Sequence, residues 1–147
     1  MGRKPSILVL SSSVVRGAVG GRAAGFAIER LGFPLWPVTT VTLPWHPGHG
    51  PGTRIVPDMA AFEALIAELA ASPRLGEIGG VLSGYLGDAR QAAAIARLVA
   101  AVKRASPDAL YLFDPVMGDG GRLYVPEAVA TAMRQHLLPL ADIVTPN

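Results

Sequence analysis

The fold is decided by the stretch Ala109-Leu110-Tyr111-Leu112-Phe113-Asp114-Pro115-Val116-Met117-Gly118-Asp119-Gly120-Gly121. Its first five residues are typical of a buried strand, and two carboxylates follow on a glycine-rich turn. In an open α/β sheet, ligands bind just beyond the carboxyl ends of the strands. Two acids at that point suit a bound cation or a metal–phosphate ligand. A solvated Asp-Gly turn is the simpler interpretation, but the whole string is more specific than one such pair.

Strand and helix patterns alternate on either side of this stretch. Apolar and β-branched runs predict strands at residues 7–10, 35–41, 78–82 and 109–113, and a fifth strand begins at Asp142. The segments between them predict helices ending near Leu31, spanning 58–72 and 88–106, and running from Pro126 to about Leu138. Asp88 and Gln91 have the spacing of a capping box. This order predicts a three-layer αβα fold, with a largely parallel sheet and helices on both faces.

Composition excludes several classes of protein. Charged residues make up 16% of the chain, the net charge is +2, and the basic residues are scattered, so nucleic-acid binding is not expected. No apolar run approaches the length of a membrane span, so no membrane association is expected. The absence of cysteine excludes disulfides and a cysteine nucleophile within this sequence, and it fits a reducing cytoplasm.

The individual motifs leave few catalytic chemistries open. Gly17, Gly20 and Gly21 match neither G-x-G-x-x-G nor a P-loop, which argues against NAD and classical P-loop binding. The serines that follow the first strand have no histidine that can be assigned to them as a general base. One of them is therefore better interpreted as a hydrogen-bond donor to a small ligand than as a nucleophile. His46 and His49 are too few for a zinc site. The loop over residues 44–57 either covers a ligand or is simply solvated.

Together these motifs resemble the pyridoxal kinase family, within the ribokinase-like superfamily, along essentially the whole chain. The two most specific blocks are Leu82-Ser83-Gly84-Tyr85-Leu86-Gly87 and Asp114-Pro115-Val116-Met117-Gly118-Asp119. Weaker blocks support them around Ser12, Arg30, Trp36, His46, Tyr124 and the segment 140–147. The resemblance implies transfer of the ATP γ-phosphate to the 5′-hydroxymethyl group of pyridoxal, in vitamin B6 salvage. It further implies a cytoplasmic homodimer that uses Mg²⁺, with K⁺ as a candidate monovalent cation.

The resemblance also implies a role for each matching position. Ser12 would hydrogen-bond the pyridine-ring side of the substrate. The remaining substrate-binding residues would be Val19, Val41, Leu43 and Tyr85 around the ring, and Pro47 and Gly48 in the loop over it. The ATP-binding residues would be Asp114, Thr145 and Asn147, and the metal-binding residues would be Asp114 and Asp119. No catalytic residue is expected in this chain, because the family's Gly-x-Gly-Asp base would lie beyond Asn147.

Two kinds of departure from the family stand out. Position 47 often carries Thr in the family, and Pro47 has neither a hydroxyl nor an N–H donor. Arg16, Gly21 and Arg22 also differ from the usual residues, near a helix expected to face a second subunit.

Family members are longer than this chain, so we expect residues 1–147 to be the N-terminal part of a single ribokinase-like domain. The sheet would be truncated after its fifth strand, with an exposed edge. This chain alone is therefore expected to be inactive, and to be marginal in stability, to aggregate or to pair. A hydroxymethylpyrimidine or sugar kinase of the same fold remains an alternative, as does a non-catalytic binding module if 147 residues is the natural length.

Overall fold

A computed structural model describes residues 4–146 and contains a five-stranded parallel sheet. The spatial order is β2-β1-β3-β4-β7, with every neighbouring pair parallel. The strands are β1 (Ser6–Val14), β2 (Leu35–Leu43), β3 (Ile78–Ser83), β4 (Leu110–Phe113) and β7 (Ile143–Val144). The largely parallel sheet predicted from the sequence is thereby confirmed.

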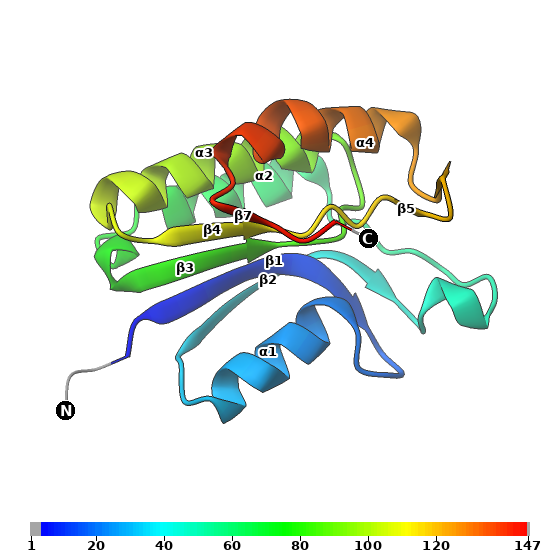
Figure 1. Ribbon diagram of the computed structural model, residues 1–147, viewed down its shortest axis with the longest axis horizontal. Coiled ribbons are helices and arrows are strands. Elements are labelled where there is room, and N and C mark those ends of the chain that lie inside the picture. The colour runs from blue at the N-terminus through cyan, green and yellow to red at the C-terminus, as the bar shows by residue number, and fades with distance from the viewer. Residues whose placement is uncertain (1–3, 147) are drawn as a thin grey trace.

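Helices cover both faces of this sheet, as Figure 1 shows. Helix α1 (Gly20–Arg30) lies on one face, against β1 and β2, and no other helix of residues 4–146 lies there. On the other face lie α2 (Met59–Ala70), α3 (Arg90–Ala105) and α4 (Glu127–Ala132). Short helical turns are η1 (Pro47–His49), η2 (Leu75–Glu77), η3 (Met133–Leu137) and η4 (Leu138–Leu140). The three-layer αβα prediction is confirmed.

The main core lies between the sheet and helices α2, α3 and α4. Alternate side chains of a strand point to opposite faces, so Leu8 and Leu10 enter this core whereas Val9 faces α1. Tyr111 and Phe113 continue the same layer from β4, and Ile95 and Leu98 meet it from α3. The carboxylate of Asp58 accepts a hydrogen bond from the N–H of Ala61 at 3.0 Å, as an N-cap should.

The structure differs from the sequence prediction at three places. Strands β1 and β2 run past the predicted ends at 10 and 41, because Ser11 and Ser13 continue the ladder despite being polar, with a register shift between them. A small antiparallel hairpin, β5 (Gly118–Asp119) and β6 (Arg122–Leu123), forms where only a turn was predicted. The helix predicted up to Leu138 changes to a π turn and then a 3₁₀ turn, because Pro139 has no N–H to continue it.

Within residues 4–146, the edge of the sheet that β7 forms is apolar. Strand β7 pairs only with β4 in the described part of the chain, and its Ile143 and Val144 are exposed. Leu110 of β4 is 54% exposed nearby. None of the helices between residues 4 and 146 has the length and apolar character needed to cross a bilayer.

Tyr111 and Ser83 form a fully buried pair of hydroxyls, 2.6 Å apart, that joins β4 to β3. We expect Tyr111→Phe to lower the free energy of unfolding by roughly 1–3 kcal/mol, because the Ser83 hydroxyl would lose its partner inside the core. Urea unfolding measures this loss. The double variant Tyr111→Phe/Ser83→Ala removes both polar groups and should recover most of it. A single variant as stable as the wild type would contradict the expectation.

The same pair predicts a dependence of stability on alkaline pH. Burial raises the pKa of Tyr111 to about 12, and the hydrogen bond with Ser83 opposes this only partly. A phenol whose pKa is higher in the folded state stabilises the protein fully below its unfolded pKa of about 10. That contribution is lost as the pH rises from there towards 12, so unfolding midpoints should fall more steeply in wild type than in Tyr111→Phe over this range.

Candidate active site

A cavity of about 810 Å³ opens beyond the carboxyl ends of β1, β3 and β4. Its walls combine Ser11, Ser12 and Val14 of β1 with Gly84 and Tyr85 after β3. Asp114 and Val116 enter it after β4, and the loop that follows β2 closes another side with His46, Pro47, Gly48 and Arg54. This is the position at which open α/β sheets bind their ligands.

Two glycines let the backbone come close to the serines of β1. A Cβ atom at Gly20 would lie 2.5 Å from Oγ of Ser12, and the φ of +56° at Gly20 also disfavours other residues. A Cβ at Gly84 would lie 2.7 Å from Oγ of Ser11. Gly20 both packs on Ser12 and lines the cavity.

Tyr85 lies between the core and the cavity. Its half-buried ring packs against the main core and against a small cluster of Val14, Val41 and Leu43, and it also lines the cavity. The guanidinium carbon of Arg54 lies 5.8 Å from the centroid of the ring. Tyr85 therefore contributes to the core and also offers a flat aromatic face to the cavity.

Gln91 ties the segment carrying Tyr85 to strand β2. Its completely buried side chain donates from Nε2 to the carbonyl of Thr40 at 2.8 Å, and Oε1 accepts from the N–H groups of Gly87 and Asp88 at 2.9 and 3.2 Å. The hydroxyl of Thr40 donates to the carbonyl of Tyr85 at 2.5 Å. The β1–β2 register shifts beside Thr40, which re-aims this part of β2.

The predicted capping box is half formed. Gln91 reaches back to the N–H of Asp88, but the Asp88 carboxylate accepts from the N–H of Arg90 at 2.8 Å and pairs with its guanidinium. The hydrogen bonds of the Gln91 side chain therefore fix the backbone of the segment before α3.

Asp114 is a half-buried acid at the end of β4. Its N–H donates to the carbonyl of Ser83 at 2.9 Å, which holds the backbone beside β3. Burial raises the pKa of its carboxyl, and a hydrogen bond with the side chain of Thr145 partly counteracts this. Thr145 is fixed in turn, because its N–H donates to the carbonyl of Phe113 at 3.1 Å.

The β5–β6 hairpin brings a second acid and a phenol to the same cavity. Asp119 is exposed, and its carboxylate accepts from the N–H of Gly120 at 2.7 Å. Tyr124 lies just after the hairpin, with its N–H donating to the carbonyl of Met117. Its pKa is raised first by burial and then by Asp114, Tyr85 and Asp119. Acids and phenols therefore gather on one side of the cavity.

Most of the residues assigned from the sequence lie on this one cavity: Ser12, Val19, Leu43, Pro47, Gly48, Tyr85, Asp114 and Asp119. Val41 does not reach its surface, because it is fully buried behind Val14 and Leu43. Thr145 meets the site through Asp114, and Asn147 lies outside the described residues. Sequence reasoning missed Arg54 and gave Tyr124 no role, since only the fold of two loops brings them here.

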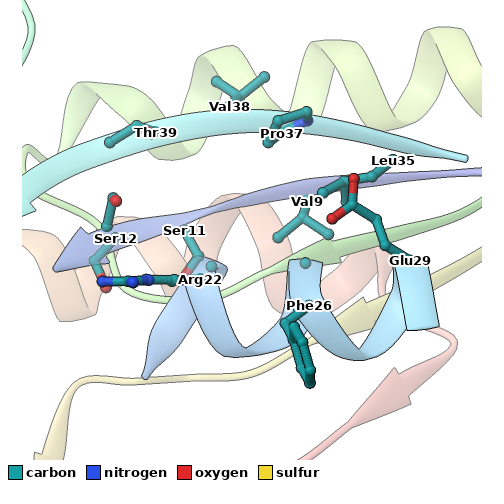
Figure 2. A pocket seen from close by; sticks show the side chains of 13 residues that line it. Val9, Ser11, Ser12, Arg22, Phe26, Glu29, Leu35, Pro37, Val38 and Thr39 are labelled. Atoms are coloured by element: carbon teal, nitrogen blue, oxygen red, sulfur yellow. The ribbon is translucent and has the colours of Figure 1, made fainter. Parts of the chain in front are cut away.

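A second, smaller hollow of about 330 Å³ lies between α1 and β2, and Figure 2 shows its side chains. Arg22 and Glu29 sit towards opposite ends of it. The guanidinium of Arg22 already donates to the carbonyl of Val15 at 2.7 Å. Phe26 is 67% exposed and points away from the sheet. Without a cluster of acids, this hollow is a weaker candidate than the cavity at the strand ends.

The comparisons with known proteins agree with this fold and site. No family model matches the chain. It is 40% identical to pyridoxal kinase PdxY of Rubrobacter xylanophilus over 143 residues, which are 97% of this chain and 49% of that protein. It is 41% identical to pyridoxal kinase PdxY of Deinococcus radiodurans, covering 97% and 48% respectively. The chain thus spans about half the length of the curated relatives it matches.

A solved structure shows the same architecture. Pyridoxal kinase from Leishmania donovani, in complex with ADP and pyridoxamine, superposes with a TM-score of 0.88 at 35% identity. The match covers 97% of this chain and 50% of that one. This similarity, together with the parallel sheet and the acid-lined cavity at its strand ends, places the fold in the ribokinase-like superfamily. Within that superfamily, the chain corresponds to the N-terminal half of proteins of the pyridoxal kinase family.

Proposed function

We propose that this chain provides the substrate-binding half of an ATP-dependent pyridoxal kinase. The reaction of the whole protein would transfer the γ-phosphate of ATP to the 5′-hydroxymethyl oxygen of pyridoxal. One observation carries the proposal. A single cavity joins Ser12 and Tyr85 to Asp114 and Asp119, in a chain about 40% identical to pyridoxal kinases. The ring side of the substrate and the phosphate side of ATP would then lie within one enclosure.

The apolar side of the cavity suits a pyridine ring. Tyr85 offers an aromatic face, and Val19 and Leu43 supply apolar walls beside it. Ser12 would hydrogen-bond the ring side of the substrate, and its position is fixed by Gly20 against it. Pro47 and Gly48, in the loop after β2, would lie over the bound ring. Val41 would support the ring-binding wall indirectly, because it packs against Val14 and Leu43.

The acidic side of the cavity suits a nucleotide triphosphate with its cation. Phosphoryl transfer depends on positioning and charge neutralisation rather than on covalent chemistry by the protein. Mg²⁺ commonly binds one or two carboxylates and completes its shell with phosphate oxygens and waters. Asp114 and Asp119 are therefore a fitting pair, although residues 4–146 contain no cluster of three or more such ligands. Thr145 and Asn147 would lie beside the phosphates, and K⁺ is a further candidate cation.

The remaining properties follow from the family. Residues 1–147 would form the N-terminal part of one ribokinase-like domain, because the chain matches about half the length of relatives that are each one protein. A homodimer and a cytoplasmic location are the states that family resemblance implies, and a sequence without cysteine is compatible with the second.

A competition assay on the protein encoded by the complete gene tests the substrate. Pyridoxal and hydroxymethylpyrimidine are offered together with Mg-ATP, and kcat/KM is determined for each. We expect pyridoxal to be preferred by at least about 100-fold, because a site built around one ring's polar groups rejects a ring that leaves them unpaired. A preference for the pyrimidine would indicate a hydroxymethylpyrimidine kinase instead. Turnover of neither substrate would refute the proposal.

A further inference from the structure

We infer that Arg54 is a specificity-determining residue that binds the ionised 3-oxygen of pyridoxal; this inference rests on the proposed function. Arg54 lines the cavity, and its guanidinium lies over the ring of Tyr85 at 5.8 Å from the centroid. No ion pair of Arg54 with a carboxylate occurs within residues 4–146. Its positive charge is thus available to a ligand.

The backbone around Arg54 is fixed to the sheet. The neighbouring Ile55 forms an antiparallel bridge with Thr42 of β2, with hydrogen bonds of 2.9 and 3.0 Å in the two directions. Side chains alternate along extended backbone, so Arg54 and Val56 share the face opposite to Ile55. Val56 packs against the Val14, Val41 and Leu43 cluster, beside Tyr85, whereas Ile55 is 63% exposed. Arg54 is therefore directed to the cavity by the strand pairing itself.

The charge of Arg54 matches one feature of the substrate. A 3-hydroxypyridine readily places its proton on the ring nitrogen, which leaves the 3-oxygen as a phenolate. Arginine is permanently charged, stacks on aromatic faces and donates several hydrogen bonds in one plane. A pyridine ring held beside Tyr85 would bring the phenolate at its rim to the guanidinium. Among the described residues lining the cavity, Arg54 is the one arginine or lysine.

The neighbouring loop gives the substrate little else to bind. Pro47 lines the same cavity but has neither an N–H nor a hydroxyl. The N–H of Gly48 donates to Nδ1 of His46 at 3.0 Å, which engages that N–H within the loop and leaves the Nε2–H of His46 as a weaker donor than a guanidinium. Arg54 is thus the strong donor that this side of the cavity offers to an anionic oxygen.

The test compares two substrates with the complete protein. Arg54→Ala should lower kcat/KM for pyridoxal by about 10-fold or more, the value of a lost charged hydrogen bond. For pyridoxal methylated on the 3-oxygen, which cannot ionise there, it should change kcat/KM by less than about 2-fold. Arg54→Lys should keep part of the preference, as it retains the charge without the planar fork. Arg104→Ala, at the exposed far end of α3, is the matched control and should change nothing.

Three results would overturn the assignment of Arg54 while leaving the proposed function intact. They are an unchanged kcat/KM for pyridoxal, an equal loss with both substrates, and a loss confined to the KM of ATP, which would make Arg54 a phosphate contact. A wild-type protein that phosphorylates neither substrate would instead refute the proposed function, and the inference with it. Because Arg54 is exposed, its variants should melt at the wild-type temperature.

Discussion

Gln91→Ala is expected to lower the free energy of unfolding by roughly 3 kcal/mol and to weaken pyridoxal binding. The side chain of Gln91 is fully buried and joins the carbonyl of Thr40 to the N–H groups of Gly87 and Asp88. Its removal leaves those groups without partners in a buried place and adds a small void. The segment that carries Tyr85 would then lose one of its connections to β2 and keep the hydrogen bond from the Thr40 hydroxyl, so the ring-binding face would be less well ordered.

Urea unfolding and the KM for pyridoxal measure the two effects of Gln91→Ala. The neighbouring Arg90→Ala is the matched control, because Arg90 pairs with Asp88 at the surface and should change neither quantity measurably. Gln91→Glu keeps the acceptor for Gly87 and Asp88 but loses the donor to Thr40, so it should be intermediate or worse. A Gln91→Ala protein with wild-type stability and KM would show that this network does not support the site.

Asp114→Asn is expected to lower kcat/KM of the complete protein by roughly 100-fold, corresponding to the loss of one carboxylate from a cation and phosphate site. Asp114 combines a position at the end of β4, partial burial and a fixed neighbour in Thr145. The amide keeps the size of the side chain, so the fold should be retained. Asp108→Asn, which changes an exposed acid at the opposite end of β4, should have no effect on activity.

The dependence on Mg²⁺ and pH gives Asp114→Asn a second readout. Burial raises the pKa of Asp114, and only the ionised carboxylate attracts a cation. Activity at limiting Mg²⁺ should therefore decline, as the pH is lowered, at a higher pH than an ordinary aspartate would give. Asp114→Asn should remove that decline. Wild-type kcat/KM in the variant, or an identical pH profile at limiting Mg²⁺, would exclude Asp114 from the phosphate site.

The parallel sheet was predictable because its strands are short apolar runs separated by capped or proline-bounded helices. The end of β1 was not, because Ser11 and Ser12 are polar yet buried by pairing and by two close glycines. The β5–β6 hairpin is only two residues on each side, too short for a strand pattern. Asp114 and Asp119 were predictable because they follow directly after a strand pattern, which is a local signal. Arg54 depends on a bridge between distant segments, which no local pattern encodes.

The most direct test of the central claim is the transfer of phosphate to pyridoxal by the protein expressed from the complete gene, with the gene sequence read beyond codon 147. With Mg-ATP, we predict one pyridoxal 5′-phosphate formed for each ADP, identified by chromatography against the authentic compound. The product should disappear when Mg²⁺ is chelated and fall sharply in Asp114→Asn. ATP hydrolysis without pyridoxal 5′-phosphate, or no reaction at all with a folded and complete protein, would contradict the account.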